Sequence, residues 1–217
     1  MGQKLNLFFD LDGTLIDISE RHYQVYRSII LELRGAPLSK TIYWKLKRNK
    51  SSISVLLSRS RLPKIFLHDY QSRFIEKIEE LKFLELDKIF NYTIPTLDSQ
   101  SKTSNLYLIT FRQSVDLTNK QLKKLKLTDK FIDIKVGRLD PSGVKTKNLM
   151  VKQVKPGSNV MIIGDTEDDI LTAKKLSIPS IAVTSGLRSK KKLEEYNPTY
   201  LIRNISYLLK IINSLVH

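Results

Sequence analysis

Short apolar runs bounded by turn residues recur along the chain, and they constrain its fold more than any other feature. Runs rich in β-branched and aromatic residues are typical of strands. Strands that alternate with helical patterns predict βαβ units, that is, an α/β fold with a parallel sheet covered on both faces. The predicted strands are Leu5–Phe9, Leu106–Thr110, Phe131–Val136, Val160–Ile163, Ile178–Val183 and Tyr200–Ile202. The predicted helices between them are Asp116–Leu127, Lys147–Val154 and Asp168–Leu176.

The segment from about Asp17 to Ile89 has a different pattern. Its apolar residues recur at helical spacing, as at Tyr26, Ile29 and Ile30, and it contains no convincing strand. A helical block between the first strand and the rest of a sheet predicts an inserted cap. We therefore expect a catalytic core at 1–16 and 92–217 and a helical cap at 17–91. The return linker is expected at Asn91–Asn105, where Thr, Ser, Pro and Asn accumulate.

Composition removes several classes of site. The 217 residues suit one domain with an inserted subdomain. The absence of Cys excludes disulfides, thiolate zinc sites, iron–sulfur clusters and a cysteine nucleophile. The three His are not spaced as metal ligands, so a metal would bind to oxygen, which favours Mg²⁺. No apolar stretch reaches the length of a membrane span, and we expect a soluble cytoplasmic protein with no membrane partner.

The chain is strongly basic, with a formal charge of +15. This charge favours anionic partners, which include phosphorylated metabolites, nucleic acid and acidic surfaces. No acidic residue occurs between Glu32 and Asp69, within the expected cap. This stretch is either a solvated basic face or a surface that steers an anionic substrate.

Two acidic clusters follow predicted strands. Asp10 and Asp12 end the first strand, and Asp165 and Asp169 follow Val160–Ile163. Turn formation and helix capping are the structural alternatives for these residues. Open α/β sheets, however, bind ligands at the carboxyl ends of their strands. Two strand ends that both present Asp would repel each other unless a cation lay between them, which again predicts Mg²⁺.

These residues resemble the motifs of the haloacid dehalogenase-like hydrolase superfamily, and in particular of its phosphatases. The first family motif, Asp-x-Asp-Gly-Thr, stands at 10–14, and the fourth, Gly-Asp-x-x-x-Asp, stands at 164–169. Thr110 matches the second motif, a Ser or Thr that ends a strand. For the third, a Lys before a helix, we prefer Lys145 to Lys147. The resemblance spans the whole chain and implies a Rossmann-like core with an inserted helical cap.

The resemblance also implies roles. Asp10 would be the nucleophile that forms an aspartyl phosphate, and Asp12 would be the general acid and base. Mg²⁺ would bind the Asp10 and Asp165 carboxylates and the backbone carbonyl of Asp12, while Asp169 would bind a metal water or orient the site. Thr110 and Lys145 would hold the phosphate. Arg112, close to the end of the same predicted strand as Thr110, is a further candidate for substrate binding.

The predicted function is therefore a magnesium-dependent phosphatase that acts on a small phosphorylated metabolite, like phosphoglycolate phosphatase. A phosphomutase uses the same pair of aspartates and remains an alternative. A basic nucleic-acid-binding protein with structural Asp clusters is a second alternative, although no recognisable nucleic-acid-binding motif accompanies the charge. Arg21, His22 and Arg48 are candidates for contacts with the leaving group. The sequence does not indicate the substrate or the oligomeric state.

Overall fold

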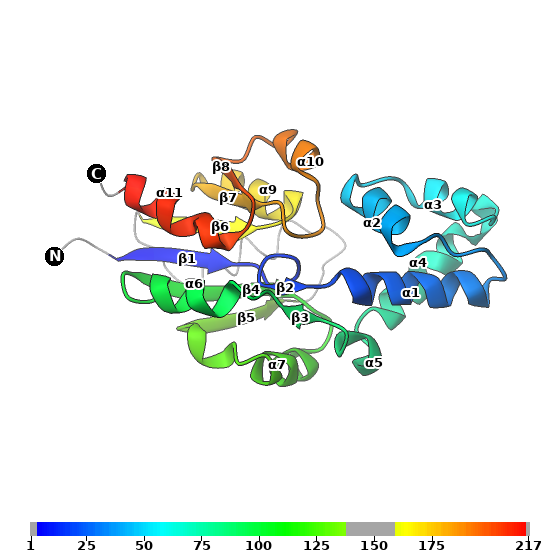
Figure 1. The fold of residues 1–217 in the computed structure, drawn as a ribbon, viewed down its shortest axis with the longest axis horizontal. Coiled ribbons are helices and arrows are strands. Elements are labelled where there is room, and N and C mark those ends of the chain that lie inside the picture. The colour runs from blue at the N-terminus through cyan, green and yellow to red at the C-terminus, as the bar shows by residue number, and fades with distance from the viewer. Residues whose placement is uncertain (1–3, 138–158, 216–217) are drawn as a thin grey trace. The chain divides into compact units, whose positions relative to one another are not determined.

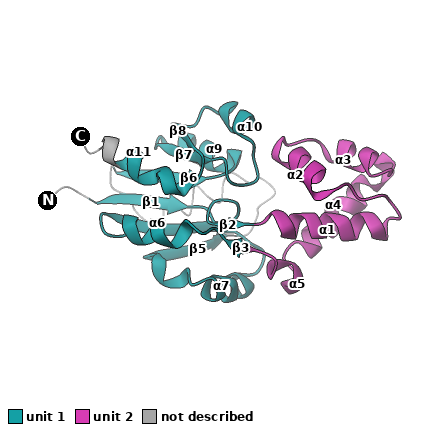
Figure 2. Cartoon of the chain, viewed as in Figure 1, with its two compact units in different colours: residues 1–17, 88–217 teal, residues 18–87 magenta. Residues whose placement is uncertain are grey.

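The computed structural model describes residues 4–137 and 159–215 (Figure 1). The chain divides into two compact units (Figure 2). We call Met1–Asp17 with Lys88–His217 the sheet unit, and Ile18–Asp87 the helical unit. The sequence boundaries proposed above, 16/17 and 91/92, compare with 17/18 and 87/88 in this division.

The sheet unit is built on six strands in the order β5-β4-β1-β6-β7-β8. Every neighbouring pair is parallel, which confirms the predicted α/β fold with a parallel sheet. In β1, Leu7, Phe8 and Phe9 are each at most 1% exposed. Because successive side chains of a strand point to opposite faces, both faces of the sheet are covered. The strands are β1 (Leu5–Phe9), β4 (Ser104–Phe111), β5 (Asp133–Gly137), β6 (Val160–Gly164), β7 (Ser180–Val183) and β8 (Tyr200–Ile202).

Helices lie in the described connections between these strands. Phe8, Ile109 and Ile162 form a buried cluster with Ala173 of α9, so that α9 packs on one face of the sheet. The predicted helix at Lys147–Val154 lies outside the described residues. The helices that the structure describes in the sheet unit are α6 (Thr93–Gln100), α7 (Val115–Lys124), α9 (Glu167–Leu176), α10 (Lys190–Glu194) and α11 (Leu208–Leu215), with 3₁₀ turns η2 (Thr128–Lys130) and η3 (Ile205–Tyr207).

The expected linker at Asn91–Asn105 is wrong, because α6 occupies most of it and β4 begins at Ser104. Pro95 lies in the first turn of α6, where a backbone N–H has no partner within the helix. Thr93 donates from its hydroxyl to the Leu15 carbonyl at 2.7 Å, and Leu97 is fully buried. Tertiary contacts thus fix a helix in a segment whose composition is typical of a loop.

Two short strands were also missed. β2 (Ile16–Asp17) pairs antiparallel with β3 (Lys88–Ile89) at the two ends of the segment interpreted as wholly helical. Two residues are too few to show alternation in a sequence.

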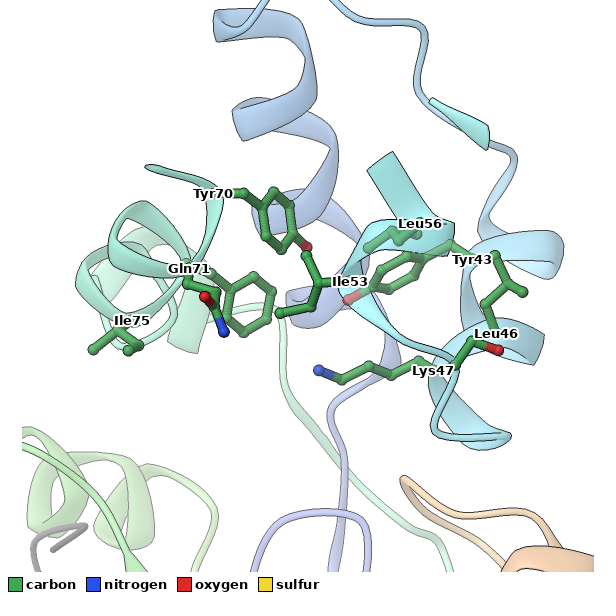
Figure 3. Close-up of a pocket in the computed structure, with 10 residues that line it drawn as sticks. Tyr43, Leu46, Lys47, Ile53, Leu56, Tyr70, Gln71 and Ile75 are labelled. Carbon is green, nitrogen blue, oxygen red and sulfur yellow. The ribbon is translucent and has the colours of Figure 1, made fainter. Parts of the chain in front are cut away.

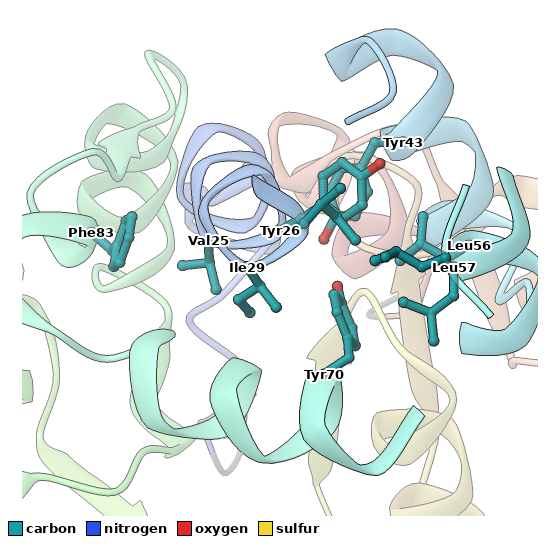
Figure 4. Close-up of a cluster of buried hydrophobic side chains, with 10 residues drawn as sticks. Val25, Tyr26, Ile29, Tyr43, Leu56, Leu57, Tyr70 and Phe83 are labelled. Atoms are coloured by element: carbon teal, nitrogen blue, oxygen red, sulfur yellow. The ribbon is translucent and has the colours of Figure 1, made fainter. Parts of the chain in front are cut away.

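The helical unit contains α1 (Ser19–Glu32), α2 (Lys40–Arg48), α3 (Ile53–Arg59), the 3₁₀ turn η1 (Lys64–Phe66), α4 (Leu67–Lys77) and α5 (Leu81–Leu84). Its core is aliphatic and aromatic (Figure 4). The rings of Tyr26 and Tyr43 stack with centroids 4.4 Å apart. The hydroxyl of Tyr26 lies 2.7 Å from the Ser60 hydroxyl and accepts from the Leu38 backbone N–H at 2.8 Å. The apolar residues of α1 therefore form part of a core, as their helical spacing predicted.

The basic stretch of the helical unit faces water for the most part. Six of its nine cations are exposed, namely Arg34, Lys45, Lys50, Arg59, Arg61 and Lys64. No helix in the described ranges, 4–137 and 159–215, is long and apolar enough to cross a bilayer.

Candidate active site

The loop after β1 carries the first acidic cluster. The backbone N–H of Asp10 donates to the Ile163 carbonyl of β6 at 2.9 Å, so that the ends of the two strands are tied together. The loop then closes on itself, because the Gly13 N–H donates to the Ile16 carbonyl at 2.9 Å. Gly13 has φ +78°, a conformation that residues with a Cβ rarely adopt.

The second acidic cluster follows β6. Asp165 is fully buried and accepts from the Thr14 hydroxyl at 3.3 Å and from the Leu187 backbone N–H at 2.5 Å. Asp169 lies in the first turn of α9, where its carboxylate accepts from the backbone N–H and the hydroxyl of Thr166 at 3.1 and 2.8 Å. Thr166 and Asp169 thus form a capping box. Asp169 therefore helps to cap α9, a role that the sequence allowed for the acidic residues of this cluster.

The two clusters meet at one edge of the sheet. One carboxylate oxygen from each of Asp10, Asp165 and Asp169 lies within 4.8 Å of the other two. The strand order reverses between β1 and β6, and open α/β sheets bind ligands at such a point. Asp10 is 8% exposed and the other two at most 2%. Three carboxylates this close repel one another, and their oxygens fit a hard divalent cation such as Mg²⁺.

Two glycines leave room for this cluster. A Cβ on Gly13 would lie 2.2 Å from the Asp165 Oδ2, and a Cβ on Gly186 would lie 2.1 Å from the same atom. Both distances are far below any contact between non-bonded atoms. Backbone and carboxylate therefore approach as closely as the chain permits.

Asp12 lies in a different environment. Its carboxylate accepts from Arg112 Nη2 at 2.5 Å, and the same nitrogen donates to the Gln121 side chain of α7 at 3.3 Å. Arg112 is only 3% exposed, whereas a quarter of the Asp12 side chain is accessible. Arg112 was predicted to bind substrate. In the structure its guanidinium contacts the Asp12 carboxylate, and substrate binding by Arg112 stays a prediction.

The other predicted residues lie in several different elements of the chain. Thr110 is the penultimate residue of β4, next to β1, and is 1% exposed. Lys145 and Lys147 lie outside the described residues. Within the helical unit, Arg21 forms an ion pair with Asp87, with Nε and Oδ1 3.1 Å apart. The His22 ring lies 5.6 Å from that of Phe74, among aromatic side chains.

Sequence reasoning missed one loop. The segment after β7 supplies Gly186 and the Leu187 N–H to Asp165, and the Ser185 hydroxyl donates to the Gly13 carbonyl at 3.0 Å. The next residue, Arg188, pairs with Glu167 at 2.6 and 2.9 Å. A Thr-Ser-Gly turn directly after an apolar strand was the available signal, because this strand ends at the same edge of the sheet.

Comparisons with known proteins agree with this arrangement. Residues 7–183 match the family described as haloacid dehalogenase-like hydrolase. The pyrophosphatase PpaX of Bacillus mycoides is 28% identical over 97% of this chain and 98% of its own length. A haloacid dehalogenase-like family hydrolase from Streptococcus pneumoniae has a similar structure, with a TM-score of 0.77 and 23% identity over 96% of this chain and 98% of that one. A hydrolase from Pseudomonas syringae gives a TM-score of 0.64 and 20% identity over 97% and 99%.

Proposed function

Because the chain belongs to the haloacid dehalogenase-like hydrolase family, we propose that it is a magnesium-dependent phosphatase that acts through an aspartyl phosphate on Asp10. The observation that carries the proposal is the convergence of Asp10, Asp165 and Asp169 within 4.8 Å. Asp10 follows β1 at the switch point of the sheet, where a bound phosphate can reach it.

The donors suit Mg²⁺. The ion would be held by the carboxylates of Asp10 and Asp165 and by the backbone carbonyl of Asp12. Asp169 would bind a water on the ion or orient the site. All of these donors are oxygens, and Mg²⁺ typically binds one or two carboxylates and keeps waters and substrate oxygens. When bound, the ion offsets the repulsion between the Asp10 carboxylate and a phosphate dianion.

Proton transfer falls to Asp12. Asp10 attacks phosphorus, and the bond to the leaving oxygen breaks as Asp12, which must begin in its protonated form, donates its proton to that oxygen. Asp12 then takes a proton from the water that hydrolyses the aspartyl phosphate, which returns both residues to their starting state. The Asp12 side chain is partly exposed, so that substrate can reach it. Its contact with Arg112 would hold its carboxylate in one orientation.

The remaining residues would bind the phosphate. Thr110, buried at the end of β4, can donate from its hydroxyl to a phosphate oxygen. Lys145 would add a positive charge from a segment outside the described residues. We further propose a cytoplasmic enzyme with the helical unit, 18–87, as its cap.

The substrate is a small phosphorylated molecule. Inorganic pyrophosphate is a specific candidate, because the relative from Bacillus mycoides that aligns with 97% of the chain is named a pyrophosphatase. A phosphomutase would use the same Asp10 and Asp12, and would return the phosphoryl group to a sugar hydroxyl instead of water.

The test is phosphate release from a generic aryl phosphate and from pyrophosphate, with and without Mg²⁺. We expect Asp10→Asn to lower turnover by at least about 10³-fold, because an amide cannot replace the carboxylate nucleophile. Removal of the metal with EDTA should have a similar effect. Asp116→Asn, an exposed change in the first turn of α7, is the matched control and should keep full activity. Turnover by Asp10→Asn equal to that of the unaltered enzyme would exclude Asp10 as nucleophile.

A further inference from the structure

The loop after β7 holds one member of the acid cluster. The Leu187 backbone N–H donates to Asp165 Oδ2 at 2.5 Å. On the side of the loop that precedes Leu187, the Ser185 hydroxyl donates to the Gly13 carbonyl at 3.0 Å and ties the loop to the one after β1. On the side that follows, the next residue is Arg188.

Arg188 makes a two-point contact with Glu167. Its Nε and Nη2 donate to Oε2 and Oε1 at 2.6 and 2.9 Å. The two side chains are 12% and 9% exposed, so that water and salt screen the contact little. A guanidinium that meets a carboxylate through two parallel hydrogen bonds is fixed in direction as well as in distance. The pair therefore fixes the chain directly after the N–H that Asp165 accepts.

Glu167 is a firm attachment point for this contact. It is the first residue of α9, where the helix dipole favours an acid, and Asp169 lies in the same turn. Arg188 thus ties the loop that holds Asp165 to the helix that carries Asp169. One ion pair joins the supports of two members of the acid cluster.

Apolar packing contributes less to this loop than to the α2–α3 region of the helical unit. There, Ile53 and Leu56 pack with Tyr43 around a pocket of about 230 Å³ (Figure 3). The loop after β7 begins with Thr-Ser-Gly, and its Leu187 is only partly buried. Polar contacts, that of Arg188 among them, are therefore the main support of this loop.

We propose that Arg188 is a positioning residue for the metal site, and that it acts through the Leu187 N–H on Asp165. This inference rests on the proposed magnesium site. Arg188 keeps the N–H directed at Asp165, so that the carboxylate keeps the orientation in which it lies within 4.8 Å of Asp10 and Asp169. Loss of a group that orients a metal ligand typically lowers metal affinity by about 10- to 100-fold.

The sign of the effect separates positioning from simple electrostatics. Arg188 is a cation, and it contacts a residue two positions from Asp165. By charge alone, its removal should strengthen the binding of a second cation, because like charges repel. Positioning predicts the opposite, namely that Arg188→Met binds the metal more weakly.

The probe is Mn²⁺, which suits the same oxygen ligands as Mg²⁺ and whose free form is measured by electron paramagnetic resonance. In the full-length protein, Arg188→Met should weaken Mn²⁺ binding about 10-fold. Arg188→Lys keeps the charge but loses the two-point contact, and should weaken binding about 3-fold. Lys192→Met breaks a more exposed contact, with Glu195, and is the matched control that should bind as the unaltered protein does.

A second readout needs no metal. In EDTA, the Leu187 amide should exchange its hydrogen at least about 10-fold faster in Arg188→Met than in the unaltered protein, as followed by NMR. The Asp10 amide, which donates to the Ile163 carbonyl, is the internal reference and should keep its exchange rate. A general loss of stability would speed exchange at both amides.

The outcomes decide the inference. Mn²⁺ binding by Arg188→Met that equals or exceeds that of the unaltered protein would overturn it, as would unchanged exchange at Leu187. If Arg188→Met does not fold, equal Mn²⁺ affinity of Arg188→Lys and the unaltered protein would overturn it. Failure of the unaltered protein to bind Mn²⁺ would overturn the magnesium site itself, and this inference with it.

Discussion

In the helical unit, Arg21 and Asp87 form an ion pair whose side chains are at most 2% exposed. In the sheet unit, Asp10, Asp165 and Asp169 bring three carboxylates within 4.8 Å of one another. The first arrangement balances its charge within the fold. The second brings together three side chains that carry the same charge when ionised, and the donors to Asp165 and Asp169 described above are neutral backbone and hydroxyl groups.

The difference separates a structural use of buried charge from a functional one. A balanced buried pair holds elements in register, and its loss leaves one charge stranded. A cluster of like charges disfavours the charged forms of its members, and a bound cation relieves that repulsion. Variants in the two units should therefore respond to neutralisation of charge in opposite ways.

The largest effect is expected at the balanced pair. Arg21→Met should lower the free energy of unfolding by about 3–5 kcal/mol, because Asp87 then remains buried without this cation. Urea denaturation measures this change. Arg73→Met, which breaks the exposed contacts of Arg73 with Glu32 and Asp69, is the control and should shift the midpoint far less.

A double variant completes this test. Replacing Asp87 by Leu in the Arg21→Met background should recover much of the loss, because no charge is then buried at this position. A loss in Arg21→Met no larger than that in Arg73→Met would contradict the structural role of the pair.

The acid cluster should behave in the opposite way. Mg²⁺ at 100 times its dissociation constant should stabilise the unaltered protein by about 2.7 kcal/mol. In EDTA, Asp169→Asn should be at least as stable as the unaltered protein, since Asn can still accept from Thr166 and one repelling charge is gone. The same variant should lose most of the Mg²⁺-dependent stabilisation. Thermal unfolding with and without Mg²⁺ measures the stability of the variant and its stabilisation by the ion. A large loss of stability of Asp169→Asn in EDTA would show that the Asp169 charge is structural.

Crowding at the acid cluster gives a third test. Gly13→Ala should cost about 1–3 kcal/mol, because φ +78° disfavours a Cβ, and it should abolish activity by displacing Asp165. Gly186 has no such conformational constraint, but a Cβ there would lie 2.1 Å from the Asp165 Oδ2 and 2.6 Å from the Gly13 Cα, so that Gly186→Ala should displace Asp165 and also destabilise the protein. Denaturation measures the loss of stability in each variant, and Mg²⁺ titration measures the effect of displacing Asp165. Normal Mg²⁺ affinity in both variants would show that the carboxylate is not held by these contacts.

The sequence predicted the sheet because parallel strands are buried on both faces and read as continuous apolar runs, as Val160–Gly164 does. It predicted the acidic residues because they follow such runs directly. The roles of Asp10, Asp165 and Asp169 remain predictions, although the structure brings their side chains together.

Other features depend on contacts between distant residues. Arg112 was chosen for its place near a strand end, but its partner Asp12 lies 100 positions away in the chain. α6 was interpreted as a linker because its packing beside Leu15 leaves no trace in composition. Spacing and composition report local structure, whereas these pairings follow from how the strands are ordered in the sheet.

The Arg112–Asp12 contact gives the smallest expected effect. It joins a buried cation to a partly exposed acid. It is therefore intermediate between the buried Arg21–Asp87 pair and the acid cluster. If Arg112 orients Asp12 as a general acid, Arg112→Met should slow hydrolysis of an alkyl phosphate about 10-fold and that of an aryl phosphate much less, because an aryl leaving group needs little protonation. Arg112→Lys should recover part of the rate. If both substrates slow equally and KM rises for each, Arg112 binds the phosphate itself, as its position in the sequence first indicated.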